Sequence, residues 1–367
     1  MSNRSQAVQV ETKQSSLEDL DDHAAPQGSV LGGTLFIINE NYFPACRVEG
    51  ESVLFVDDDT DAVSEADPAT LVAKLQQEAE HSCDWLQDNR MCVAGHKSKL
   101  LVVGTKELRR SRLDGRELCI EVDGKLVKET QSEKLLGVIL NNKLTWKEHL
   151  YGETWRTDGQ NNQGLIPQLS QRLGILRRLS AVASKAKLRM IAQGLFYSKL
   201  SYCLPLFTNT WGLDNYRDGE TRSTSFTKED NRKLQVIQNQ VARLMVDKRE
   251  LQGRMNMPTK ELLELSGDLS VHQLGALSTV NLTKKILLTQ KPLYLAQRLQ
   301  ATQERRTRAG ATLAQENLSL GLAKEGFIHR GTKLFNLLPD TMKQEENMEH
   351  FKATVKVWIK ETISVKP

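Results

Sequence analysis

Four apolar residues, Val53–Val56, run directly into a stretch of five residues that contains four aspartates, and apolar sequence returns at Ala62. Valine, leucine and phenylalanine favour an extended, half-buried backbone. Two apolar runs separated by a short polar stretch are typical of a β-hairpin. The pattern therefore predicts a hairpin with Asp57 and Asp58 at or near its tip.

Most of the remaining apolar positions recur at helical spacing. Glycine and serine before the apolar run 30–38 predict a loop that enters a helix, and Asp67–Pro68 predicts the start of another that ends near residues 85–89. Further amphipathic helices are expected at 169–178, 185–195, 233–246, 258–265, 271–288, 293–299 and 348–363.

This order of elements predicts an α+β protein. Residues 152–164 are rich in Gly, Asn, Gln and Thr, which is typical of a linker or loop. We expect a weakly ordered segment at 1–25, a part with an antiparallel sheet at 26–152, and helical regions at 165–290 and 291–367.

Composition indicates an ordinary soluble protein, since 26% of the 367 residues are charged and 39% are hydrophobic. No apolar run is long enough for a membrane span, and the N-terminus does not resemble a signal peptide. The five cysteines are widely spaced and include no Cys-x-x-Cys, which favours reduced thiols and no zinc site. We therefore expect an intracellular protein, in the cytoplasm or nucleus.

The formal charge of +4 is small, but its distribution is uneven. No Asp or Glu occurs from Gly159 to Leu213, where basic side chains alternate with leucines at helical spacing. Two interpretations are open: a solvated basic helix pair, or a surface that matches a phosphate backbone. The basic residues predicted to bind nucleic acid are Arg172, Arg177, Arg178, Lys185, Lys187 and Arg189.

The aspartate run has four interpretations. It can be a solvated turn, or its adjacent carboxylates can bind a divalent cation such as Mg²⁺. An EF-hand loop starting at Asp57 is excluded, because its sixth and twelfth positions would be Ala62 and Pro68. A haloacid dehalogenase-type phosphatase fits Asp57 and Asp59 but not Asp61. A polymerase palm fits the order aromatic, small, Asp, Asp at Phe55–Asp58.

The segments around the hairpin decide between these interpretations. Pro26–Gly32 has the order Pro-Gln-Gly-Ser-x-Leu-Gly, an apolar helix follows, and Phe55–Asp58 comes next. Later segments fall in the same order: 96–103, 134–140 and 333–339. Together they resemble the reverse transcriptases of non-LTR retrotransposons, from about Gln27 to Trp358.

The resemblance implies an RNA-directed DNA polymerase that uses Mg²⁺, a template–primer duplex and deoxynucleotides. It assigns Asp57 and Asp58 as catalytic metal ligands in a partial palm. It places Gln27, Gly28, Ser29 and Lys97 near the incoming nucleotide, and Leu136 and Gly137 in the segment that grips the primer. The basic helices correspond to the thumb, which holds the duplex.

The sequence also departs from the family pattern. The family carries a further Asp on a palm strand before the Pro-Gln-Gly segment, after a fingers region, and only 25 residues precede Pro26. Gly33 stands where the family usually has Pro, and Tyr42 lies where an Asp is expected. We therefore expect a fragment that starts within the palm and does not polymerise DNA alone. The alternative is a non-catalytic nucleic-acid-binding remnant; the oligomeric state stays open.

Overall fold

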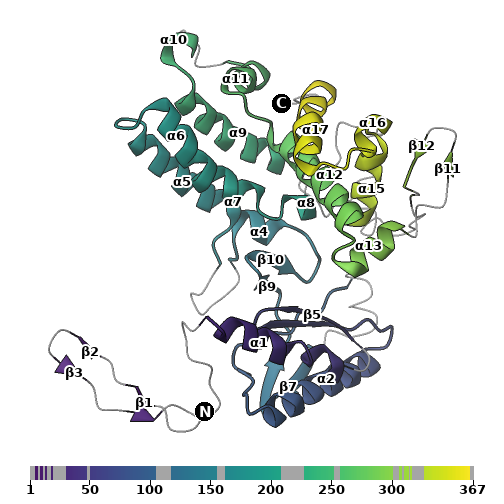
Figure 1. Cartoon of the computed structure of the whole chain (residues 1–367). Helices are drawn as coiled ribbons and strands as arrows, with labels where there is room; N and C mark the ends of the chain where they lie inside the picture. The colour runs from purple at the N-terminus through teal and green to yellow at the C-terminus, as the bar shows by residue number, and fades with distance from the viewer. Residues whose placement is uncertain are drawn as a thin grey trace. The chain divides into compact units, whose positions relative to one another are not determined.

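A computed structural model gives the fold of this α+β protein (Figure 1). It describes residues 5–6, 9–10, 13–14, 18–19, 30–47, 50–104, 117–154, 162–207, 227–251, 257–300, 306–307, 310–313, 315 and 326–363. The chain divides into two compact units, Met1–Gln131 and Ser132–Pro367, which we call unit 1 and unit 2 and describe separately.

In its described residues, unit 1 contains hairpins and three helical segments. Its elements are β1 (Ser5–Gln6), β2 (Gln9–Val10), β3 (Lys13–Gln14), β4 (Glu18–Asp19), α1 (Gly32–Glu40), the 3₁₀ turn η1 (Phe43–Cys46), β5 (Glu51–Phe55), β6 (Asp58–Ala62), α2 (Pro68–Asp88), β7 (Cys119–Val122) and β8 (Lys125–Lys128). The strands pair antiparallel as β1–β4, β2–β3, β5–β6 and β7–β8. Among the described residues these pairs do not join into one sheet, so a palm sheet stays a prediction.

Helix α2 begins and ends where the sequence predicts. The Asp67 carboxylate accepts a hydrogen bond from the Thr70 N–H at 2.9 Å, and Pro68 occupies the first turn. The helix packs against β7 and η1, where the Phe43 ring meets Trp85 edge-on at 5.0 Å between centroids. Four buried residues, Leu100, Val102, Val122 and Val127, form the small core beside it.

Unit 2 is mostly helical. Its elements are β9 (Ser132–Leu135), β10 (Val138–Asn141), α4 (Lys147–Tyr151), α5 (Leu165–Leu179), α6 (Lys185–Ala192), the π-helical turn η2 (Gln193–Tyr197), α7 (Ser198–Ser201), α8 (Leu204–Phe207), α9 (Lys228–Met245), α10 (Lys248–Leu251), α11 (Thr259–Ser266), α12 (Val271–Thr289), α13 (Leu293–Gln300), β11 (Arg306–Thr307), β12 (Gly310–Ala311), α15 (Phe327–Asn336), α16 (Asp340–Lys343) and α17 (Met348–Thr362). These bounds confirm the helices predicted from periodicity.

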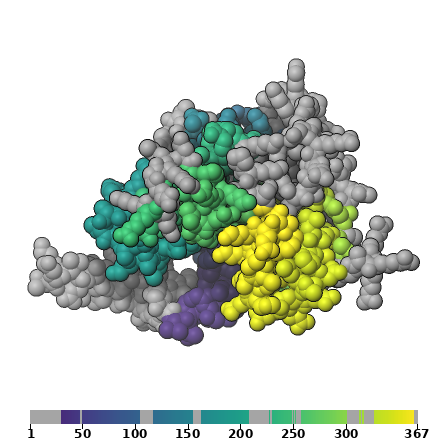
Figure 2. Space-filling view, turned by 90° about the horizontal axis from the view of Figure 1, so that it is seen from above, coloured from purple at the N-terminus to yellow at the C-terminus, as the bar shows by residue number. Residues whose placement is uncertain are grey.

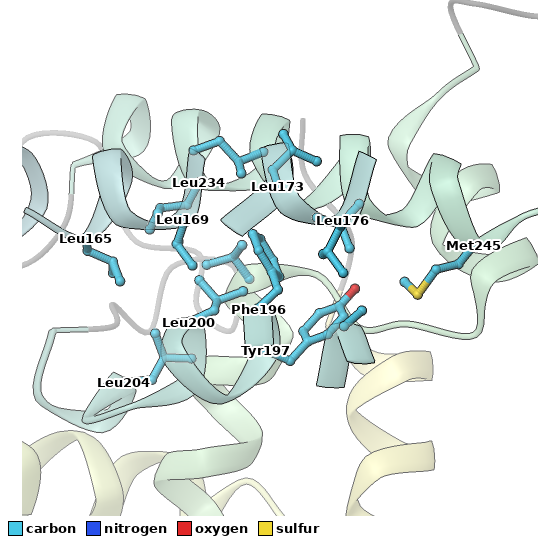
Figure 3. Packing of buried hydrophobic residues seen from close by; sticks show 14 of the residues in the cluster. Leu165, Leu169, Leu173, Leu176, Phe196, Tyr197, Leu200, Leu204, Leu234 and Met245 are labelled. Carbon is cyan, nitrogen blue, oxygen red and sulfur yellow. The ribbon is translucent and has the colours of Figure 1, made fainter. Parts of the chain in front are cut away.

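The apolar face of α5 builds the main core of unit 2. Leu165, Leu169, Leu173 and Leu176 recur every three or four residues and are buried against Phe196 and its neighbours (Figure 3). Burying each such leucine contributes about 1.5–3 kcal/mol relative to leaving it in water. The predicted pair of amphipathic helices is therefore confirmed.

The hairpin β9–β10 and helix α4 belong to unit 2, so the division lies at 131/132, whereas the sequence suggested 152. The reason is packing: Leu150 is buried in the α5 core, and the Trp146 and His149 rings contact Phe207. The polar stretch after residue 152 separates α4 from α5 in sequence, but both helices contribute to the same core.

The C-terminal helices form a second cluster around α12, which contacts both α15 and α17. In Figure 2 the yellow helices lie beside the green segment of the same unit. The helices α12 and α15 approach closely at Gly331, where an added Cβ would lie 2.5 Å from the Thr283 hydroxyl. None of the described helices is long and apolar enough to cross a membrane.

Candidate functional site: the aspartate hairpin and the basic helices

The hairpin β5–β6 confirms the predicted position of the aspartates. Phe55 pairs with Asp58, so Val56 and Asp57 form the turn, and Val56 adopts a positive φ of 60°. A positive φ is unusual for a β-branched residue and marks a tight turn. Both Asp57 and Asp58 are exposed.

Of the other two aspartates of the run, Asp61 is half-buried and Asp59 is exposed, although the Asp59 side chain itself is only 22% exposed. Asp59 and Asp61 are two residues apart on β6, so their side chains lie on the same face of the hairpin. Asp61 pairs across the hairpin with Ser52. On that face the Arg47 guanidinium, only 5% exposed, forms ion pairs with Asp59 and, at 3.0 Å, with Asp61. The Ser52 hydroxyl also donates to Asp59 at 2.8 Å.

Arg47 joins this hairpin to helix α2. Its guanidinium donates to the Glu78 main-chain oxygen at 3.0 Å and to the Ser82 hydroxyl, and it lies 4.7 Å from the centroid of the Phe43 ring. The buried Glu78 carboxylate, 4.0 Å from Arg47, accepts a hydrogen bond from the Gly50 N–H at 3.0 Å. We call Arg47, Asp59, Asp61 and Glu78 the Arg47 cluster.

The carboxylates of the Arg47 cluster repel one another. Burial raises the pKa of Asp61 to about 6, the Asp59 charge adds to the rise, and Arg47 opposes it. The pKa of Glu40, at the end of α1, is also raised, first by burial and then by Asp59 and Asp57. Glu40 therefore lies within electrostatic range of the hairpin.

Sequence reasoning missed Arg47, Glu78 and Glu40. One signal was available: aspartates two residues apart on a strand point to one face, and half-buried carboxylates on one face require a cation nearby. The sequence offers no way to tell which basic residue supplies it.

The Mg²⁺ site expected at Asp57 and Asp58 stays a prediction. Asp59 and Asp61 pair with Arg47, and in the part of the chain that the structure describes no three His, Cys, Asp or Glu side chains are grouped to hold a metal ion. Lys97 is exposed in a turn, with no described contact to Asp57 or Asp58. Gln27, Gly28 and Ser29 lie outside the described residues.

In unit 2, four of the six basic residues predicted to contact nucleic acid donate hydrogen bonds to other parts of the fold, although three of them, Lys185, Arg189 and Arg177, are exposed. Lys185 Nζ donates to the Leu244 and Val246 carbonyl oxygens at 2.7 and 3.0 Å, at the end of α9. The other bonds are Arg189 to the Ser266 carbonyl (3.0 Å), Arg172 to the Leu195 carbonyl (2.5 Å) and Arg177 to the Gln240 side-chain oxygen (2.6 Å). The carbonyls at helix ends carry partial negative charge and attract cations.

Arg178 and Lys187 differ from these four. Both are exposed, and neither side chain makes a hydrogen bond or ion pair with any residue that the structure describes. Arg177 is also exposed, and its partner Gln240 is neutral, so its charge is not compensated. We call these three residues the exposed basic set; among the described residues none of their side chains bonds a main-chain carbonyl or a carboxylate.

The turn Leu136–Gly137 links β9 to β10, with φ values of 45° and 84°. The Tyr202 hydroxyl donates to the Leu136 carbonyl oxygen at 2.6 Å, and the Tyr202 ring lies 3.4 Å from the Cβ position of Gly137. Unit 2 thus holds the predicted primer-grip turn against the segment that follows α7.

Comparison of the chain with protein-family models, curated proteins and solved structures finds no match. The resemblance to reverse transcriptases therefore rests on the sequence motifs alone.

Replacement of Arg47 tests its role in unit 1. Arg47→Met leaves three carboxylates without their cation, so we expect a loss of about 3 kcal/mol in the free energy of unfolding and faster hydrogen exchange at residues 51–62. Arg47→Lys should recover only part, because a single ammonium cannot replace the forked guanidinium. The exposed Lys97→Met is the control. Equal stability of Arg47→Met and Lys97→Met would contradict the role of the cluster.

The raised pKa of Asp61 predicts a pH dependence. The Asp61 carboxyl holds its proton more tightly in the folded protein than in the unfolded chain. Its contribution to the free energy of unfolding is therefore full below about pH 4 and is lost as pH rises through about 6. In the wild type, this group should lower the free energy of unfolding by about 1–2 kcal/mol between pH 4 and 7, and Asp61→Asn should lack this decrease. Urea titrations across this range measure it, with the exposed Asp58→Asn as control. An unchanged slope in Asp61→Asn would refute the assignment.

Proposed function

We propose that this protein is reverse transcriptase-like, of retrotransposon origin, and that its helical unit binds a nucleic-acid duplex. In this proposal the hairpin carrying Asp57 and Asp58 is the counterpart of the polymerase palm hairpin and does not catalyse nucleotide addition on its own. The collinear motifs support the ancestry, and the hairpin turn at Val56–Asp57 agrees with it.

The exposed basic set carries the binding part of the proposal. Arg177 and Arg178 lie in the last turn of α5, and Lys187 lies early in α6, which packs against α5. The stretch from Gly159 to Leu213 contains no carboxylate that could compete with phosphate for these cations. Guanidinium groups bind phosphate oxygens in pairs and ammonium groups bind them as point charges. Contacts of this type recognise the backbone and do not read base sequence.

The chemistry of the hairpin tip supports the proposal that this chain alone does not catalyse nucleotide addition. Nucleotidyl transfer of this type requires two metal ions held between carboxylates. Two adjacent exposed aspartates offer only part of such a ligand set, and Glu40 is not grouped with them as a metal ligand among the described residues. Binding without catalysis is therefore the function we favour for this chain.

A charge-reversal variant tests the binding. Arg178→Glu combined with Lys187→Glu should weaken binding of a 20-base-pair RNA–DNA duplex by about tenfold or more, because two phosphate contacts become repulsive. Fluorescence anisotropy at several salt concentrations should also give a shallower slope of log K against log salt, by about two. Binding should not depend on the duplex sequence.

The matched control is Lys352→Glu with Lys356→Glu, which makes the same change of charge on the exposed face of α17. It should bind duplex almost as the wild type does. If both double variants bind equally well, the exposed basic set is not the binding surface.

A further inference from the structure

The charges of Lys134 on β9 and Arg172 on α5 act on the Lys199 ammonium of α7, and the Leu195 carbonyl that Arg172 bonds lies four residues before Lys199. Lys134 is exposed, whereas Arg172 and Lys199 are half-buried. Two of the three lie within the stretch that contains no Asp or Glu. We call these residues the cation cluster.

Tyr202 positions the strand side of the cation cluster. Its hydroxyl donates to the Leu136 carbonyl at 2.6 Å, which holds the β9–β10 turn two residues from Lys134. Its ring also lies 5.9 Å from Lys199 Nζ, a cation–π contact. Tyr202 thus contacts Lys199 directly and holds the turn that follows Lys134.

The π-helical turn η2 positions the arginine. Arg172 Nη1 donates to the Leu195 carbonyl oxygen within η2, directly before α7. A π-helical turn displaces carbonyls from the regular helical hydrogen-bond pattern, and such turns are frequent at functional sites. The bond uses one guanidinium nitrogen, so the other terminal nitrogen can donate to a ligand.

The electrostatics of Lys199 agree with an uncompensated group of cations. Burial lowers its pKa first, and the charges of Arg172 and Lys134 lower it further, whereas the Cys203 thiol acts in the opposite direction. Among the residues that the structure describes, no carboxylate contributes to this shift. The neighbouring His149 is buried, and burial together with Lys199 lowers its pKa to about 4, so it adds no positive charge at neutral pH.

We propose that Lys134, Arg172 and Lys199 form a phosphate-binding site. A phosphate group offers several acceptor oxygens and a negative charge, which matches cationic donors from three elements and offsets their mutual repulsion. The phosphate can belong to a nucleic-acid strand, in which case the site deepens the proposed function, or it can be a free phosphate or pyrophosphate.

Calorimetric titration of the full chain with pyrophosphate tests the site directly. The wild type should bind pyrophosphate with a saturable isotherm, and Lys134→Gln and Lys199→Gln should each weaken it about tenfold. Lys356→Gln on α17 removes one charge elsewhere and should bind as the wild type does. Lys134 is exposed, so its variant keeps the test valid if Lys199→Gln does not fold. Wild-type pyrophosphate affinity in the folded variants would overturn the site.

Thermal unfolding without ligand gives a second readout. Lys199→Gln should unfold at a higher temperature than the wild type, because the substitution removes repulsion from Arg172 and Lys134. A residue with a purely structural role would lower the unfolding temperature on substitution. A lower unfolding temperature for Lys199→Gln would therefore count against the cation cluster as a ligand site.

Duplex binding identifies the source of the phosphate. If Lys134→Gln weakens both pyrophosphate and duplex binding, the site holds a strand phosphate. If it weakens pyrophosphate alone, the site stands with free phosphate as its ligand. The Arg178→Glu, Lys187→Glu variant should keep its pyrophosphate affinity, so failure of the proposed function and failure of this site give different results.

Discussion

Main-chain carbonyls at the ends of helices hold many of the cations of unit 2. Lysine and arginine side chains reach across to the last turn of a neighbouring helix, where carbonyl oxygens lack intrahelical partners. A hydrogen bond from a charged donor contributes about 1.5–3 kcal/mol, and burying such a carbonyl unpaired costs a similar amount. The donors are Lys185, Arg189, Lys284 and Arg330, and they bond the ends of α9, α11, α16 and α8 respectively. The helical unit therefore depends on hydrogen bonds from these basic side chains, of which Lys284 and Arg330 are buried.

In unit 1 charged side chains also need partners within the fold, but there most of them are negative. There the paired charges are carboxylates, and one guanidinium, that of Arg47, binds two aspartates of β6 and the main chain of α2. The inner aspartates Asp59 and Asp61 serve the fold, whereas Asp57 and Asp58 extend from the turn into solvent. In both units, some charges are paired within the fold, whereas others, such as the side chains of Arg178 and Lys187 in unit 2, bond no residue that the structure describes.

Local signals in the sequence predicted the elements well. Asp67–Pro68 marks the start of α2, Gly267 ends α11 with a left-handed φ of 72°, and the leucine period locates α5. Tertiary partners were not predictable in this way. The carbonyls that Lys185 and Arg189 bond lie 59 to 77 residues away in sequence, so composition alone could not predict these bonds. Likewise, the packing of α4 on α5 depends on a contact across the polar stretch after residue 152.

The central claim is that this chain binds duplex without extending it. The most direct measurement is incorporation of a labelled deoxynucleotide into a primer–template with Mg²⁺, at protein concentrations where anisotropy shows the duplex to be bound. The account predicts bound duplex and no incorporation above a protein-free control. Magnesium-dependent incorporation that disappears in Asp57→Asn would contradict it.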